Sequence, residues 1–240
     1  MKAMVLAAGL GTRMRPLTLE TPKPLIEVGG KALIDWSLEG LKDAGITDIV
    51  VNASYLGEQV ATHIATKSDL SIRLSHEDAP LETGGGIKKA LPFLGSDPFL
   101  VMNSDAFCLP AKEAIEELRN VHEQAGNAIT LLVQPVEKAV GYNGRGDFAL
   151  TDERKLRRRQ PEDEQLPFVF TGMQMLDPSI FTGVAEEKFS MNLLYDASID
   201  GNAVLQKVTA CIHEGIWLHV GAPDEKAAAE AYLIDHPAGE

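Results

Sequence analysis

The sequence of 240 residues predicts an α/β fold, with a doubly wound, Rossmann-like and mainly parallel sheet that carries a small antiparallel insert. Two observations support this fold class. Up to about residue 134, short apolar runs typical of buried parallel strands alternate with segments of helical periodicity, and such strands pair through right-handed crossovers. From residue 143 to 175 the predicted strands are shorter and separated by turn signals, which is typical of an antiparallel insert.

The first part of the chain opens with an apolar strand over residues 2–7 that ends at glycines, as a fully buried parallel strand does. In the first helix Leu33, Leu38 and Leu41 recur at helical spacing, and Gly45 ends it. The same criteria predict further strands over 48–52, 70–75, 98–103 and 128–134, and further helices over 56–64, just after Gly86 and over 110–124.

The second part of the chain has shorter elements. The pattern predicts strands over 148–150, 155–159 and 168–176, a helix over 191–199, strands over 204–210 and 217–220, and a helix rich in Ala and Glu over 223–234. No repeat or low-complexity linker interrupts the chain. We therefore expect one domain over 1–240, with a first part over about 1–134, a second over about 135–222 and a C-terminal helical segment over 223–240.

The composition excludes several classes of protein. With 22 Lys and Arg against 35 Asp and Glu the formal net charge is −13, which argues against binding to nucleic acid or to an anionic membrane. No apolar run reaches the roughly 18 residues of a membrane span, and the N-terminal run is too short for a signal peptide. Cys108 and Cys211 lie far apart and form neither a C-x-x-C pair nor a zinc ligand set. We therefore expect a cytoplasmic protein with reduced thiols.

A glycine-containing segment, residues 6–16, follows the first strand directly, where open α/β sheets bind ligands. It contains no Walker A motif, and Met14 stands where the dinucleotide-binding pattern needs its third glycine. Small residues let backbone N–H groups approach a phosphate, and Arg13, Arg15 and Lys23 supply positive charge. The segment therefore predicts a phosphate-binding loop.

Three further segments carry candidate binding residues. Residues 80–86 end in three successive glycines before a predicted helix, which suits the close approach of a flat ring or an anion. Asp105 follows a strand in the same crevice and is either a turn former or a Mg²⁺ ligand. The second interpretation is chemically reasonable because Mg²⁺ takes one or two carboxylates and completes its shell with phosphate oxygens and water. Residues 143–148 are typical of the turn that starts a hairpin.

Residues 6–18 and 22–25 resemble the signature of sugar-1-phosphate nucleotidyltransferases, Leu-Ala-Ala-Gly-x-Gly-Thr-Arg-x-Arg-Pro-Leu-Thr followed by Pro-Lys-Pro-Leu. The resemblance implies a fold of the nucleotide-diphospho-sugar transferase type. It implies the reaction of a nucleoside triphosphate with a sugar 1-phosphate to give a nucleotide sugar and pyrophosphate. It also implies three catalytic residues: Arg13 at the leaving pyrophosphate, Lys23 at the reacting phosphates and Asp105 on Mg²⁺.

The same resemblance implies which residues bind the substrates. The nucleotide-binding residues would be Leu6, Ala7, Ala8, Gly9, Gly11, Thr12, Arg13, Lys23, Glu82, Thr83, Gly84 and Gly85. Those that bind the sugar would be Asn103, Gly146, Asp147 and Gly172. The first part of the chain would then bind the nucleotide and the second the sugar. Because the acyltransferase or β-helix extensions common in the family have no counterpart in this sequence, we expect a monomer.

Two segments are similar to those of the N-acetylmuramate-1-phosphate uridylyltransferases within this family, Leu-Glu-Thr-Gly-Gly-Gly at 81–86 and Gly-Arg-Gly-Asp-Phe at 144–148. This similarity favours UTP and N-acetylmuramate 1-phosphate, and hence the recycling of peptidoglycan. The family's usual Glu-Lys-Pro has no counterpart, and residues 158–162, Arg-Arg-Gln-Pro-Glu, take its place. The alternatives are guanylyl transfer to mannose or heptose 1-phosphate, and a regulatory protein that binds nucleotide sugars with weakened catalysis.

His219 stands where the family has the aspartate that is its second metal ligand. Mg²⁺ prefers oxygen ligands, whereas imidazole suits softer ions such as Mn²⁺ or Co²⁺. His219 therefore holds a water in the metal shell, or binds one of these other ions, or leaves Asp105 as the protein's single metal ligand.

Overall fold

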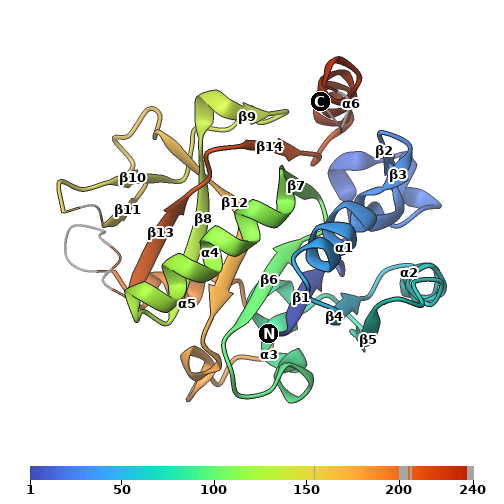
Figure 1. Cartoon of the computed structure of the whole chain (residues 1–240), viewed down its shortest axis with the longest axis horizontal. Helices are drawn as coiled ribbons and strands as arrows, with labels where there is room; N and C mark the ends of the chain where they lie inside the picture. The colour runs from blue at the N-terminus through green and yellow to red at the C-terminus, as the bar shows by residue number, and fades with distance from the viewer. Residues whose placement is uncertain (154, 200–204, 206, 237–240) are drawn as a thin grey trace.

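The computed structural model describes residues 1–153, 155–199, 205 and 207–236, and its centre is a mixed sheet with helices on both faces (Figure 1). The strands of this sheet are β1 (Ala3–Leu6), β4 (Asp48–Ala53), β5 (Ser71–His76), β6 (Phe99–Asn103), β8 (Ile129–Pro135), β10 (Phe148–Leu150), β11 (Leu156–Arg158), β12 (Phe168–Leu176) and β13 (Val208–Ile212). Among the described residues their order is β11-β10-β12-β6-β1-β4-β5, and β8 pairs with both β12 and β13.

The helices and two small sheets surround this main sheet. The helices are α1 (Leu33–Asp43), α2 (Gly57–Ile64), α3 (Glu82–Leu94), α4 (Ala111–Ala125), α5 (Asn192–Asp196) and α6 (Pro223–Asp235). The small sheets consist of β7 (Ala106–Leu109), β14 (Ile216–His219) and β9 (Ala139–Val140), and of β2 (Glu27–Val28) with β3 (Lys31–Ala32). No helix in the described part of the chain is long and apolar enough to cross a membrane.

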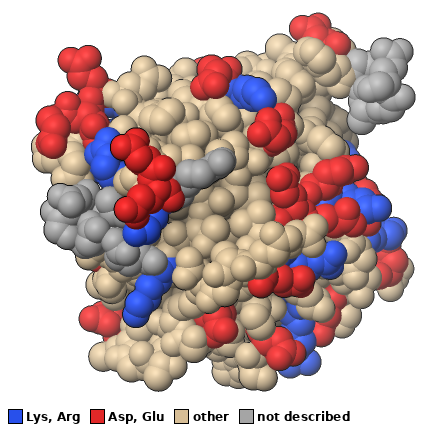
Figure 2. Space-filling view, turned by 60° about the vertical axis from the view of Figure 1, so that its left-hand side comes forward, with Lys and Arg blue, Asp and Glu red and all other residues tan. Residues whose placement is uncertain are grey.

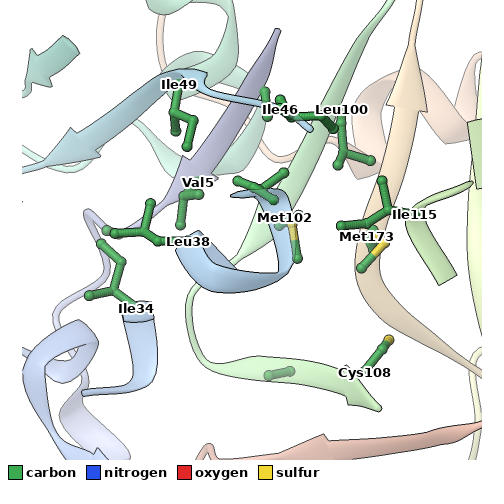
Figure 3. Packing of buried hydrophobic residues seen from close by; sticks show 14 of the residues in the cluster. Val5, Ile34, Leu38, Ile46, Ile49, Leu100, Met102, Cys108, Ile115 and Met173 are labelled. Atoms are coloured by element: carbon green, nitrogen blue, oxygen red, sulfur yellow. The ribbon is translucent and has the colours of Figure 1, made fainter. Parts of the chain in front are cut away.

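Strand β1 lies between β4 and β6 and is parallel to both. Its residues are apolar and alternate between the two faces, so Val5 packs in a cluster with α1, α2 and α4, while Met4 packs on the other face with α3 and α5. Figure 3 shows Val5 in the first cluster, together with Leu38 of α1 and Met102 of β6. The predicted parallel, doubly wound core is thus confirmed. The carboxyl ends of β1, β4 and β6 meet at one edge of the sheet.

Strand β12 differs from its prediction as part of a small insert. It is nine residues long and lies inside the main sheet, antiparallel to both β6 and β8. Its pairing with β8 is irregular between Phe170 and Gln174, where Gly172 adopts a φ of +85°. The predicted short strands over 148–150 and 155–159 do form, as β10 and β11, and they pair antiparallel with each other next to β12. The sheet is therefore mixed, because β12 runs antiparallel to its neighbours. β12 also supplies apolar residues to the core.

The sheet of β7, β14 and β9 connects the end of the chain to β6. The sequence predicted β14, one residue later in the chain, but neither β7 nor β9, since strands of four and two residues show little periodicity. β14 is antiparallel to β7, with His219 opposite Ala106. The N–H of Val220 donates to the carbonyl oxygen of Asp105 at 2.9 Å. This pairing carries His219 to the end of β6.

Other differences concern the ends of elements. α5 ends at Asp196, short of the predicted helix over 191–199. β13 begins at Val208, and two of the four earlier positions predicted for its strand, 204 and 206, lie outside the described residues. α6 ends at Asp235, and residues 237–240 also lie outside the described part.

Helix α3 begins earlier than predicted. The sequence predicted a short helix after Gly86, whereas α3 runs for 13 residues from Glu82 and contains the three glycines near its start. The glycines remove side chains where the helix packs most closely. A Cβ on Gly85 would overlap the backbone carbonyl oxygen of Glu187, and the glycines on either side are also tightly packed. Close packing, rather than loop flexibility, therefore accounts for the three glycines.

Replacing Gly85 with alanine tests this packing. We expect Gly85→Ala to lower the free energy of unfolding by about 1–3 kcal/mol, the usual cost of overpacking, although alanine is the better helix former. Gly57→Ala is the matched control: this glycine also begins a helix, and its Cβ would make an ordinary contact at 3.4 Å with Ala53. Urea unfolding of both variants is the measurement, and a Gly85→Ala protein as stable as the native one would contradict the packing.

Candidate active site

A cavity of about 210 Å³ lies where the carboxyl ends of β1, β4 and β6 meet. Its walls are the glycine-containing loop after β1, the start of α3 and the ends of the strands. The lining residues are Leu6, Ala7, Ala8, Gly9, Lys23, Pro24, Asn52, Glu77, Pro80, Glu82, Thr83, Asn103, Ser104 and Asp105. The structure thus brings together predicted site residues from four separate stretches of the chain, namely Leu6, Ala7, Ala8, Gly9, Lys23, Glu82, Thr83, Asn103 and Asp105.

The loop after β1 folds back on itself, so that Lys23 enters the cavity. Gly11 has a φ of +61°, and a Cβ there would lie 2.9 Å from Thr18 Cγ2 and 3.0 Å from Lys23 Cβ. The buried Thr18 holds this turn, because its Oγ1 donates to the carbonyl oxygen of Gly11 at 2.8 Å. Thr12 and Arg13 are exposed and lie outside the cavity wall. Only glycine fits this tight turn, which directs Lys23 into the cavity.

Lys23 and Asp105 form an ion pair inside the cavity. Lys23 Nζ donates to Asp105 Oδ2 at 2.6 Å, and the side chains are 11% and 29% exposed. Burial by itself would raise the pKa of Asp105, but the charge and hydrogen bond of Lys23, with smaller contributions from His219 and Arg13, hold that pKa below its usual value. Asp105 is therefore an anion at neutral pH, next to a fixed ammonium group.

Two buried polar residues that the sequence did not single out hold the backbone on both sides of the cavity. The N–H of Ala7 donates to Asn52 Oδ1 at 2.8 Å, and Asn52 Nδ2 donates to Glu77 Oε1 at 2.7 Å. The other carboxylate oxygen of Glu77 accepts the N–H of Leu81 at 2.9 Å. A signal was available for both, because each lies at the carboxyl end of a predicted strand, where such sheets bind ligands.

Glu82 and Thr83 close the cavity from the start of α3. Thr83 Oγ1 accepts the N–H of Met191 at 2.9 Å, which ties α3 to the segment before α5. Glu82 is exposed and has a φ of +62°, a left-handed conformation that costs a residue with a Cβ roughly 1–2 kcal/mol. Gly84 and Gly85, predicted to bind the nucleotide, are buried in helix packing and do not line the cavity. A strained residue beside a cavity is a candidate for function.

Glu225, at the start of α6, connects two predicted residues that lie outside the cavity wall. Its Oε2 accepts the N–H of Gly221 at 2.6 Å, and its Oε1 lies 3.9 Å from Arg13 Nη1. Oε2 also lies 3.1 Å from His219 Nδ1, without the geometry of a hydrogen bond. The sequence analysis missed Glu225. Its place in the first turn of a helix was the available signal, since an acidic side chain there reaches back to free N–H groups.

His219 is 16% exposed, and its ring stacks on Trp217 with the centroids 5.3 Å apart. Burial lowers the pKa of His219 and outweighs the opposite influence of Asp105 and Glu225. The imidazole is therefore mainly neutral at pH 7. The structure places it between the ring of Trp217 and the carboxylate of Glu225.

The donor set fits a Mg²⁺ ion that the substrate helps to coordinate. Asp105 supplies one carboxylate to the cavity, and the described residues contain no group of three or more His, Cys, Asp or Glu side chains that could hold a metal. Mg²⁺ commonly takes one or two carboxylates and completes its shell with phosphate oxygens and water. Asp105 therefore suits a site that substrate phosphates complete, and the chain offers no site built by protein ligands alone within its described part.

The four residues predicted to bind the sugar lie in different places around β12. Asn103 lines the cavity, and Gly172 packs behind it, where a Cβ would lie 2.6 Å from Asn103 Nδ2. Gly146 is buried and has a φ of +72°. Asp147, the residue after it, lines a second cavity of about 400 Å³.

The chain matches the model of the nucleotidyl transferase family over residues 2–233. It is 37% identical over 240 residues to the N-acetylmuramate alpha-1-phosphate uridylyltransferase of Caulobacter vibrioides, covering 97% of each chain. It is 33% identical over 236 residues to the mannose-1-phosphate guanyltransferase of Hypocrea jecorina, covering 94% of this chain and 62% of that one. The crystal structure of HddC from Yersinia pseudotuberculosis has the same fold, with a TM-score of 0.77 at 20% identity over 96% of this chain and 99% of that chain.

Replacing Glu82 with glycine and with alanine separates backbone strain from the role of the side chain. Both changes delete the carboxylate, but only glycine adopts a φ of +62° without strain, so we expect Glu82→Gly to be more stable than Glu82→Ala by about 1 kcal/mol in urea unfolding. Both variants should weaken nucleotide binding equally, because both remove the carboxylate of a residue that lines the cavity. Equal stabilities of the two variants would contradict strain at Glu82, and unequal nucleotide affinities of the two variants would contradict a role of its side chain.

Proposed function

This chain belongs to the nucleotidyl transferase family, and we propose that it joins UTP to N-acetylmuramate 1-phosphate to give the nucleotide sugar and pyrophosphate. The observation that carries the proposal is the cavity in which Lys23 and Asp105 meet beside the glycine-containing loop. Support for the base and the sugar comes from the uridylyltransferase of Caulobacter vibrioides, to which the chain is 37% identical over nearly its full length.

A nucleoside triphosphate is strongly anionic, and a chain with a net charge of −13 needs local cations to bind it. In the reaction, a phosphate oxygen of the sugar 1-phosphate attacks the α-phosphorus in line. The bond from that phosphorus to the bridging oxygen breaks, and pyrophosphate leaves on the opposite side. The attacking oxygen is already an anion and needs no general base. Catalysis therefore consists of positioning the two phosphates and neutralising their charge.

The residues of the first cavity divide these tasks. Lys23, held by Asp105 at 2.6 Å, would contact the α-phosphate and the incoming phosphate. Arg13, which is 63% exposed outside the cavity wall and reaches Glu225, would stabilise the departing pyrophosphate. Asp105 would hold Mg²⁺, which supplies further positive charge at the phosphates when it is bound. His219 lies beside Glu225 and would interact with the carboxylate of Glu225 rather than bind the metal as a second ligand.

The proposed setting is the cytoplasm. Cys108 and Cys211 are both unpaired and buried, which suits a reducing compartment. N-Acetylmuramate is a sugar of peptidoglycan, so the proposed product would return that sugar to cell-wall synthesis.

Two other functions compete with this one. Guanylyl transfer to mannose 1-phosphate is favoured by the 33% identity to the guanyltransferase of Hypocrea jecorina. A regulatory protein that only binds nucleotide sugars is favoured by the loss of the family's second metal aspartate at position 219. The presence of Lys23 inside the cavity argues for catalysis, since a binding protein has less need of a cation at the reacting phosphates.

Release of pyrophosphate tests the proposal over a grid of UTP, GTP and dTTP with the 1-phosphates of N-acetylmuramate, N-acetylglucosamine, mannose and glucose. We expect the highest kcat/KM for UTP with N-acetylmuramate 1-phosphate. Lys23→Ala, checked by urea unfolding, should lose about 100-fold or more in turnover, as expected for a preorganised charge. A maximum for GTP with mannose 1-phosphate would establish guanylyl transfer instead, and tight nucleotide binding without turnover would establish the regulatory function.

A metal titration of the same activity tests the role of Asp105. We expect EDTA to abolish activity, Mg²⁺ to restore it and Asp105→Asn to remove it. His219→Asp adds a carboxylate near Asp105 and Glu225, so it should lower the Mg²⁺ concentration at half-maximal activity by about tenfold, since affinity rises with the charge of the ligands. His236→Asp, an exposed position after α6, is the matched control. Native Mg²⁺ dependence in Asp105→Asn would exclude Asp105 from the metal site.

A further inference from the structure

A second cavity lies at the antiparallel end of the main sheet, among β10, β11, β12 and α5. Its volume is about 400 Å³, and its lining includes Asp147, Arg158, Arg159, Phe170, Asn192 and Tyr195. Figure 2 turns this end of the molecule forward and shows, among the described residues, basic side chains that lie between acidic ones. The lining thus contains two neighbouring arginines, although the chain has a net charge of −13.

Strand β11 and the residue after it carry three successive arginines, of which two are neutralised. Arg157 donates to both carboxylate oxygens of Asp163, at 2.7 and 3.0 Å. Arg158 forms an ion pair with Asp196. The side chain of Arg159 forms neither an ion pair nor a hydrogen bond with any of the described residues, and it lines the second cavity. Its charge is therefore available to a ligand there.

Backbone pairing holds Arg159 next to Asp147. The N–H of Arg159 donates to the carbonyl oxygen of Asp147 at 3.2 Å. One carboxylate oxygen of Asp147 accepts the N–H of Phe170 at 2.9 Å, which ties this side chain to β12. The rings of Phe170 and Tyr195 meet edge to face, 6.4 Å apart, and form an apolar wall. The cavity thus combines a free cation, a hydrogen-bond acceptor and an apolar surface.

The second cavity shares structural elements with the first. Met191, just before α5, donates its N–H to Thr83 Oγ1, and Thr83 lines the first cavity. On β12, Phe170 lines the second cavity, and Gly172, two residues further along, packs against Asn103 of the first. A sugar 1-phosphate with its phosphate in the first cavity would therefore extend its ring toward the second.

We propose that Arg159 binds a carboxylate carried by the sugar ring of the substrate. The inference rests on the proposed function, because N-acetylmuramate differs from N-acetylglucosamine by a lactyl ether that bears a carboxylate. A guanidinium group matches a carboxylate with two parallel hydrogen bonds. Asp147 would accept from a sugar hydroxyl or the acetamido N–H, and Phe170 would cover the methyl group of the lactyl ether. Arg159 is then a specificity residue for an acidic sugar.

Steady-state kinetics with two sugar phosphates test the proposal. N-Acetylglucosamine 1-phosphate serves as the second sugar because it lacks the lactyl carboxylate. If the enzyme does not turn over this sugar, its inhibition constant is measured in place of kcat/KM. We expect Arg159→Gln to lower kcat/KM for N-acetylmuramate 1-phosphate by about 10- to 100-fold, which is the effect of losing a hydrogen bond to a charged group. The same variant should change kcat/KM, or the inhibition constant, for N-acetylglucosamine 1-phosphate by less than about threefold. Arg159→Lys, which keeps the charge without the paired donors, should lie between Arg159→Gln and the native chain.

Arg119→Gln on α4 is the matched control, because this arginine lies by a hollow at the opposite ends of the strands, and it should leave both sugars unaffected. Urea unfolding of Arg159→Gln reports whether the fold is kept. An equal fall for both sugars, or no fall for either, would overturn the inference and leave uridylyl transfer intact. A native chain that does not use N-acetylmuramate 1-phosphate would refute the proposed function, and this inference with it.

Discussion

The ion pair between Lys23 and Asp105 is the interaction on which the site depends. The two residues lie 82 positions apart in the sequence, and they meet because β1 lies between β4 and β6 with all three strands parallel. Lys23 holds the pKa of Asp105 below its usual value in a place where burial favours the neutral carboxyl. An ammonium group and a carboxylate are therefore held at one point, at the edge of the sheet where the strand ends face outward.

The two cavities divide the chemistry between the two parts of the sheet. The parallel part presents the first cavity, and the buried pair Asn52 and Glu77 holds the backbone on either side of it. The antiparallel part presents the second cavity, where the side chain of Arg159 forms no ion pair with any of the described residues. In the proposed function, the handling of phosphates and the selection of the sugar thus depend on different strands. We therefore expect a substitution in β10 or β11 to change which sugar fits without moving Lys23.

The sequence by itself determined the parallel core and the loop that we propose binds phosphates. A strand buried on both faces must be apolar along its length, as β1 is, and a helix over such a sheet shows one apolar face, as α1 does. The residues of the first loop are neighbours along the chain, so their pattern alone indicates an anion site. Asn52 and Glu77 could also have been found, since each stands at the end of a readable strand.

Only the tertiary structure decided the rest, because it depends on contacts between distant segments that local periodicity does not record. The three glycines were expected to precede a helix and to admit a flat ring or an anion, whereas they lie inside α3 and two of them pack against residues 187–189. His219 is a lone histidine until β14 pairs with β7 and α6 places Glu225 beside it. Three successive arginines look alike in the sequence. The positions of Asp163 and Asp196 neutralise two of them, and this leaves Arg159 for a ligand.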